Sequence, residues 1–154
     1  MKIRELLKPE AVRVDADVKT KEEALNMLID LHDQAGNLSD KAVYARDVFE
    51  REAECVTAIG QGIAIPHAKS AAVRTPGLAA LTVPGGLDCS ALDGKPSMLF
   101  FMIAAPEDGD LHLEILSALV SLLMDPALRE RLLSVPSSEA FLEELNRAEA
   151  AKTE

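Results

Sequence analysis

The chain contains three histidines, and two of them stand where an imidazole could do chemistry. His67 follows a glycine-containing stretch, a short apolar run and Pro66, so a rigid residue holds it at the expected end of a strand. His112 follows an acidic loop and opens a segment of helical periodicity, where free backbone N–H groups favour anions. An imidazole with an ordinary pKa of about 6.5 is largely neutral near pH 7 and can act as a nucleophile.

Arg51 and His32 are two further candidates with different expected roles. Arg51 stands near the end of a predicted helix, shortly before the glycine-containing stretch, where a guanidinium is ordinarily solvated. Beside an imidazole, the same planar cation would suit a planar anion such as a phosphoryl group. His32 falls on the apolar side of the first predicted helix near its end, so we interpret it as a structural or helix-capping histidine.

Motifs of several other enzyme classes are missing from the sequence. The stretch Gly60-Gln61-Gly62 is not followed by Gly-Lys-Ser/Thr and does not read GxGxxG, so it is neither type of nucleotide-binding loop. The sequence has no HExxH, no zinc-ligand spacing of Cys and His, and no GxSxG nucleophile elbow. His67 and His112 together with carboxylates leave a metal-dependent hydrolase open as a minor alternative.

The candidate side chains depend on the elements that position them. Residues 11–14 alternate like a short strand, and Thr20 with Glu23 forms a capping box before a helix that ends at a Gly-Asn pair. Ser39 is the expected N-cap of a second helix, which should fade near Glu52. Further strands are expected at residues 63–65, 77–83 and 98–104, and further helices at 111–124, at 127–133 and from 137 onwards.

This order of elements places the strands in the middle of the chain and helices at both ends. It predicts a sheet with helices packed against it, of the α+β or mixed α/β class. Short connections between some of the middle strands predict antiparallel pairs, and the wholly apolar run 98–104 is typical of a strand buried on both faces. Residues 148–154 are small and polar, which indicates a flexible tail.

Composition limits the class of protein further. A length of 154 residues suits one domain, and 48% hydrophobic against 27% charged residues indicates a globular chain. The formal net charge of −10 argues against nucleic acid and anionic membrane surfaces as partners. With no run of about 18 apolar residues and no secretory signal, we expect a cytoplasmic protein with two reduced cysteines, Cys55 and Cys89.

Three blocks of sequence together resemble a known family. They are Arg51-Glu52-Ala53-Glu54 through Ile65-Pro66-His67, then Ala91-Leu92-Asp93-Gly94-Lys95-Pro96 with Ala104-Ala105-Pro106, and finally Leu111-His112-Leu113 with Asp125-Pro126. With them, residues 1–147 resemble the type 2 enzyme IIA domains, fructose/mannitol type, of the bacterial phosphoenolpyruvate-dependent sugar phosphotransferase system. The Ile-Pro-His element behind a glycine turn is specific when it occurs with the other two blocks.

The resemblance implies a phosphocarrier built as a three-layer sandwich, with a mixed β-sheet flanked by helices on both sides. His67 would accept a phosphoryl group from the phosphohistidine of the carrier protein HPr and pass it to a cysteine of an enzyme IIB component. His112 would help to hold the phosphoryl group, and Arg51 would supply a fixed cation. Phosphoryl transfer of this kind needs positioning and charge stabilisation, so neither a metal nor a cofactor is expected.

The chain departs from the family pattern near the expected acceptor. The family usually has Gly-Ser at Cys55-Val56, and commonly Gly at Ala58, Asn at Gln61 and Gly at Ala68. A second interpretation keeps the same acceptor histidine: a nitrogen-related enzyme IIA module that binds targets according to its phosphorylation state. The sequence identifies neither the sugar nor the oligomeric state. Residues 1–147 are expected to form the enzyme IIA domain, with residues 148–154 as its C-terminal tail.

Overall fold

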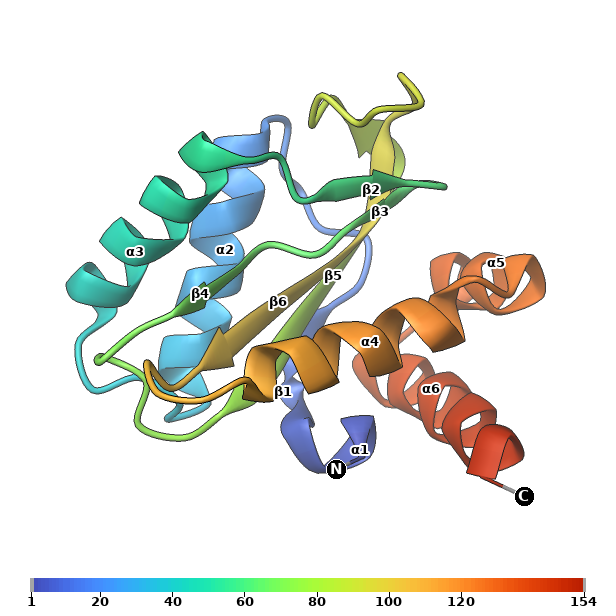
Figure 1. The fold of residues 1–154 in the computed structure, drawn as a ribbon. Coiled ribbons are helices and arrows are strands. Elements are labelled where there is room, and N and C mark those ends of the chain that lie inside the picture. The colour runs from blue at the N-terminus through green and yellow to red at the C-terminus, as the bar shows by residue number, and fades with distance from the viewer. Residues whose placement is uncertain (1, 154) are drawn as a thin grey trace.

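The computed structural model describes residues 2–153, which form six helices and six strands (Figure 1). The helices are α1 (Ile3–Leu6), α2 (Lys21–Gln34), α3 (Lys41–Glu54), α4 (Leu111–Leu123), α5 (Pro126–Ser134) and α6 (Ser138–Thr153). The strands are β1 (Leu7–Arg13), β2 (Ala58–Gly60), β3 (Ile63–Ala64), β4 (His67–Lys69), β5 (Gly77–Leu87) and β6 (Ser97–Ala105).

The strands form one mixed sheet between two layers of helices. Its order is β1-β5-β6-β3-β2, and β4 pairs with β6 as well. The pairs β5–β6 and β2–β3 are antiparallel, whereas β1–β5, β3–β6 and β4–β6 are parallel. Helices α2 and α3 lie on one side of the sheet, and α4, α5 and α6 lie on the other (Figure 1). The predicted three-layer α/β sandwich with a mixed sheet is confirmed.

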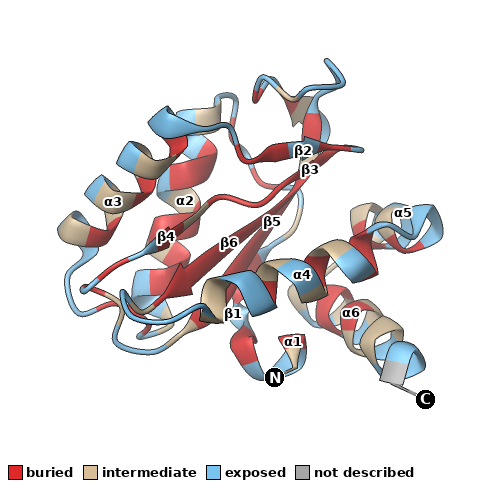
Figure 2. Ribbon diagram, viewed as in Figure 1, coloured by how far each residue is buried: buried red, intermediate tan, exposed pale blue. Residues whose placement is uncertain are grey.

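Strand β6 is the buried centre of the sheet. All of its residues except Met98 are buried (Figure 2), which confirms the expectation of a strand covered on both faces. It pairs with β5 along one edge, and with β3 and then β4 along the other. Phe100 and Phe101 point to opposite faces, and burial of each side chain contributes roughly 1.5–3 kcal/mol. Phe101 packs against Phe141 of α6, with the ring centroids 5.8 Å apart.

The starts of α2 and α3 follow local capping signals. The Thr20 hydroxyl accepts a hydrogen bond from the Glu23 N–H at 3.1 Å, which confirms Thr20 as the N-cap. The Glu23 carboxylate accepts from the Lys19 N–H at 2.9 Å, one residue before the cap, so the return bond of the predicted capping box is shifted by one residue. The prediction of Ser39 as the N-cap of α3 is wrong. Asp40 is the cap, because its carboxylate accepts from the Val43 N–H at 3.2 Å, while the Ser39 hydroxyl donates to the Ala72 carbonyl.

Several element boundaries differ from the sequence-based expectation. Strand β5 continues through Pro84 to Leu87 instead of ending at Val83. Pro84 is tolerated because it lies within a register shift between Thr82 and Leu87, where the regular pairing with β6 is interrupted. Helix α1 was not predicted; its buried Ile3 and Leu6 anchor it before β1. Helix α6 continues through residues 148–153, which the sequence pattern assigned to a tail.

Two buried side chains fasten α2 and α3 to the backbone of β6. The Nε2 of His32 donates to the Met102 carbonyl at 3.0 Å, so its Nδ1 accepts from the Asn37 side-chain amide at 3.0 Å. The Tyr44 hydroxyl donates to the Ile103 carbonyl at 3.0 Å. His32 is fully buried, which confirms its structural interpretation. These bonds fix both helices against the end of β6 that pairs with β4.

His32 should make the protein acid-sensitive. Burial lowers its pKa from 6.5 to about 4, although the hydrogen bond to Met102 opposes the shift. The neutral His32 ring therefore stabilises the fold fully above pH 6.5. As the pH falls from 6.5 toward 4, the free energy of unfolding should decrease by a total of roughly 3 kcal/mol. Urea denaturation between pH 7 and pH 4 measures this loss. A His32→Gln variant should be less stable at pH 7 and should lose less stability over that range; equal slopes in the two proteins would contradict the assignment.

Candidate functional site

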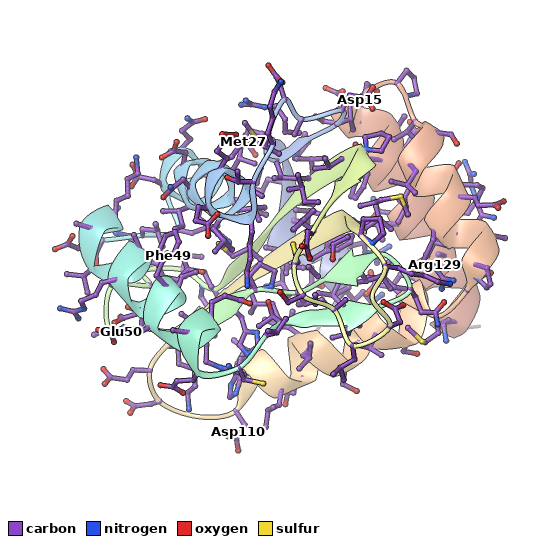
Figure 3. The ribbon with its side chains drawn as sticks, turned by 90° about the horizontal axis from the view of Figure 1, so that it is seen from above. Asp15, Met27, Phe49, Glu50, Asp110 and Arg129 are labelled. Carbon is purple, nitrogen blue, oxygen red and sulfur yellow. The ribbon has the colours of Figure 1, made fainter. Side chains whose placement is uncertain are left out.

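The three side chains singled out in the sequence line one cavity of about 330 Å³. His67 comes from the first residue of β4, Arg51 from the last turns of α3, and His112 from the first turn of α4. The cavity therefore lies where β4 meets one helix from each layer. Figure 3 shows α3, with Phe49 and Glu50 labelled, and the start of α4 at Asp110 on the same side of the molecule. The remaining lining residues are Asp47, Ala68, Lys69, Leu113 and Leu116.

Backbone pairing with β6 positions His67. His67 lies opposite Ile103 in the parallel ladder, and the Ile103 N–H donates to the Pro66 carbonyl at 3.0 Å. His67 thus begins β4 instead of ending a strand, which corrects the sequence-based expectation. Its Nδ1 lies 2.9 Å from the Ile65 carbonyl oxygen. Because a carbonyl only accepts, the proton of this hydrogen bond sits on Nδ1 and the lone pair of the neutral ring is on Nε2.

Asp93 holds the turn between β2 and β3, shortly before His67. Its carboxylate accepts hydrogen bonds from the Gln61 N–H at 2.9 Å and the Lys95 N–H at 3.0 Å, and these bonds, Gln61 first, lower the pKa of Asp93. Gly60 and Gly62 have φ values of +90° and +78°, which side-chain-bearing residues rarely adopt. A Cβ on Gly60 would also lie 3.1 Å from the Asp93 carboxylate. No local sequence pattern marks Asp93 for this role, because its partner Gln61 lies 32 residues earlier in the chain.

His112 lies beside His67 in the cavity. The two ring centroids are 6.1 Å apart and the rings are tilted by 30°. Among residues 2–153, the buried Nδ1 of His112 has no hydrogen-bond partner. Burial lowers the pKa of His112, and positive charge at Lys69 and at His67 lowers it further. The ring therefore stays neutral near pH 7 and can form a hydrogen bond with an anion without adding charge.

Arg51 and Asp47 lie one turn apart on the same face of α3. The Arg51 Nη1 donates to the Cys55 carbonyl at 3.4 Å, just beyond the end of the helix. The Asp47 carboxylate accepts from the Ser70 hydroxyl at 2.6 Å, which connects α3 to the segment after β4. Asp47 and Lys69 were both missed in the sequence. The available signal for Lys69 was its spacing, because residues two apart on a strand share a face.

A buried carboxylate next to Arg51 fixes the chain that leaves α3. Glu52 accepts hydrogen bonds from the Thr57 N–H at 3.1 Å and the Thr57 hydroxyl at 2.6 Å, and its carboxylate lies 2.7 Å from the Lys21 ammonium. Burial alone would raise the pKa of Glu52, but the bonds from Lys21 and Thr57 together lower it. Helix α3 is therefore connected to α2 and to the loop before β2, which limits how far Arg51 can move.

The apolar spacing of residues 111–124 predicts only part of the buried face of α4. Leu119 and Leu123 are buried as the spacing predicts, whereas Leu113 and Met124, which share that spacing, are 52% and 47% exposed. The residues of α4 that are buried are Ile115, Leu119, Leu122 and Leu123. The helix is apolar around most of its circumference, so hydrophobic spacing alone does not identify the buried side. Leu113 instead lies at the cavity next to His112, where it presents an apolar surface.

Two other classes of site find little support in the described residues. Within residues 2–153, no three His, Cys, Asp or Glu side chains are grouped as metal ligands would be, so the metal-dependent alternative lacks a ligand set. In the same range no single helix has the length and apolar character needed to cross a membrane. Helices α4 and α5 meet that test only as a pair, bent by 92°.

Comparisons with known proteins agree on one family. Residues 5–148 match the model of the phosphoenolpyruvate-dependent sugar phosphotransferase system, EIIA 2. The chain is 41% identical over 147 residues to the PTS system fructose-specific EIIABC component of Bacillus subtilis, covering 95% of this chain and 23% of that protein. It is 41% identical over 131 residues to the PTS system fructose-specific EIIA component of Haloferax volcanii, covering 84% of this chain and 85% of that protein.

A solved structure has the same fold as this chain. The crystal structure of nitrogen regulatory protein IIA-Ntr from Neisseria meningitidis superposes with a TM-score of 0.85 at 31% identity. The match covers 93% of this chain and 98% of that chain. The chain therefore covers nearly the whole length of the IIA-Ntr chain, whereas it spans about a quarter of the length of the Bacillus component.

The titration of His112 tests the electrostatics of the cavity. Because burial and the charges at Lys69 and His67 lower its pKa, its NMR titration midpoint should lie below 6.5. In a His67→Gln variant the midpoint should rise, since one source of positive charge is removed, while the titration of His32 should stay unchanged. A midpoint at or above 6.5 in the wild type would contradict the geometry of the site.

Proposed function

The chain belongs to the EIIA 2 family of the phosphoenolpyruvate-dependent sugar phosphotransferase system, and from that premise we propose a cytoplasmic phosphocarrier that is phosphorylated on His67. The proposed donor is the phosphohistidine of HPr, and the proposed acceptor is a cysteine of an enzyme IIB component. The observation that carries the proposal is the convergence of His67, His112 and Arg51 on one cavity. The family match over residues 5–148 supports residues 1–147 as the enzyme IIA domain.

The hydrogen bond to Ile65 explains how one imidazole can both accept and release the group. The lone pair on His67 Nε2 forms a bond to phosphorus as the P–N bond of phospho-HPr breaks, and the HPr imidazole leaves with the electron pair. The His67 proton stays on Nδ1, where the Ile65 carbonyl accepts it at 2.9 Å. The phosphorylated ring is therefore cationic. When phosphorus moves on to a thiolate, the electron pair returns to Nε2 and the ring leaves neutral.

The surroundings of His67 suit the charge of the transferring group. The transition state is loose and spreads negative charge over three oxygens, so fixed donors and cations contribute most of the catalysis. Arg51 supplies a permanent cation, and neutral His112 can form a hydrogen bond to one oxygen. The first turn of α4 adds the partial positive charge of its free N–H groups, because the side chain of its N-cap Asp110 makes no capping hydrogen bond.

Fructose uptake is the role that the comparisons favour. Both relatives at 41% identity are fructose-specific components by name. A second candidate is a regulatory module, supported by the nitrogen regulatory protein with a TM-score of 0.85. The two differ in the fate of the phosphoryl group. Transfer from the phosphorylated chain to a cysteine of a fructose enzyme IIB supports uptake, whereas a phosphorylated chain that retains its group beside that enzyme IIB supports regulation.

Phosphorylation of His67 is tested by intact mass. After incubation with phosphoenolpyruvate, enzyme I and HPr, the wild type should gain an acid-labile mass of about 80 Da, and His67→Ala should gain none. The variant should stay folded, since His67 is only partly buried at the start of an edge strand. Circular dichroism and thermal melting check the fold. A fully phosphorylated His67→Ala protein would overturn the assignment.

The roles of Arg51 and His112 are tested by rate. We expect Arg51→Ala to slow phosphoryl transfer from phospho-HPr about 100-fold and His112→Ala about tenfold, because each removes one stabilising group but leaves the acceptor. Quenched-flow measurement of phosphoprotein gives both rates. Arg147→Ala is the matched control, since Arg147 is an exposed residue of α6 paired with Glu144. Rates equal to this control would contradict the proposed roles.

A further inference from the structure

We propose that Lys69 is a further catalytic residue, whose ammonium binds the phosphoryl group on His67 as a second cation beside Arg51. This inference rests on the proposed function, because it needs a phosphoryl group at His67. None of the sequence blocks that carry the family resemblance contains Lys69. It follows instead from the position of Lys69 on β4, from the absence of a partner for its charge among residues 2–153, and from the charges around the cavity.

The strand β4 directs Lys69 and His67 to the same side. Alternation along a strand puts His67 and Lys69 on one face and Ala68, only 3% exposed, on the other. Their Cα atoms are two residue steps apart along the strand, a distance of about 6.5 Å. A lysine side chain spans that distance, so its ammonium can reach oxygens attached to the neighbouring imidazole. Lys69 indeed lines the same cavity as His67, His112 and Arg51.

The ammonium of Lys69 is free to bind a ligand. Within residues 2–153 it makes no hydrogen bond or ion pair, and its residue is exposed. By contrast, Arg46, which lines a cavity with Lys69, pairs with Asp47 at 3.3 Å. Lys69 can therefore meet a phosphoryl group without first breaking an existing ion pair.

The charges around the cavity leave room for a second cation. A phosphoryl group carries close to two negative charges near pH 7. Arg51 supplies one positive charge, His112 is neutral near pH 7, and the carboxylate of Asp47 lines the same cavity. Because the Asp47 carboxylate is already paired with Arg46 at 3.3 Å, Arg51 without Lys69 would face a dianion with a single positive charge. With Lys69 the cavity carries a net positive charge when the group arrives.

The effect of Lys69 on its surroundings supports this placement. Burial is the main cause of the lowered pKa of His112, and the charge of Lys69 comes next, ahead of His67 and Arg51. The ammonium therefore acts electrostatically on the space where the two imidazoles face each other. Lys69 also lines a neighbouring cavity of about 280 Å³, which shares Asp47 and Arg51 with the first and includes Glu50, Glu54 and Glu107.

The test compares three substitutions in transfer from phospho-HPr at varied phospho-HPr concentration, where kcat is the limiting rate constant and KM the concentration that gives half of it. Lys69→Met removes the charge at similar length, Lys69→Arg keeps it, and Lys95→Met is the matched control. Lys95 lines a cavity with Arg129, which Figure 3 shows on the opposite side of the molecule from Glu50. We expect Lys69→Met to lower kcat about tenfold with little change in KM, Lys69→Arg to retain at least a third of the rate, and Lys95→Met to match the wild type.

A second readout does not depend on transfer. In the unphosphorylated protein, Lys69→Met should raise the NMR titration midpoint of His112, whereas Lys95→Met should not. Thermal melting checks that all variants are folded. A kcat for Lys69→Met within twofold of Lys95→Met would overturn the inference, and so would a loss confined to KM, which indicates a docking role. A wild type that takes no phosphoryl group from phospho-HPr overturns the proposed function and this inference with it.

Discussion

The pairing of β6 with its neighbours is the constraint on which the rest of the structure depends. This strand is buried on both faces, so each of its backbone groups must be paired within the protein. The long strand β5 pairs with one edge of β6, and two short strands, β3 and then β4, pair with the other edge. Its carbonyls at Met102 and Ile103 also accept bonds from His32 and Tyr44, which holds the α2–α3 layer in place.

The site is a consequence of the break between β3 and β4. Pro66 lacks an N–H and cannot continue the ladder of a paired strand, but its carbonyl accepts from Ile103. The chain therefore leaves β6 after Ala64, which lies opposite Phe100, and pairs with it again from His67, which lies opposite Ile103. A rigid histidine at an open edge suits a carrier, because the acceptor must be held still and yet be reached by two partner proteins in turn.

The sequence predicted the parts of the site that have strong local signals. His67 is marked by its glycine turn and proline, and His112 by its position at a helix start. The roles of Asp47 and Asp93 could not be predicted this way, because each depends on a contact between distant segments: Asp47 with Ser70 and Asp93 with Gln61. The buried face of α4 was predicted only in part, at Leu119 and Leu123, since a helix that is apolar around most of its circumference gives a weak signal for its buried side.

The backbone conformation at Gln61 and Ala68 shows what their departures from the family pattern cost or contribute. Gln61, where the family commonly has asparagine, has a φ of +59°, a conformation in which asparagine is less strained than glutamine. The bond from its N–H to Asp93 and the contact of its side-chain oxygen with Arg129 hold it there. Ala68, where the family commonly has glycine, has no positive φ and points its methyl group into the core. The turn therefore stores a small strain, while β4 gains a buried apolar residue between His67 and Lys69, the two residues of the strand that line the cavity.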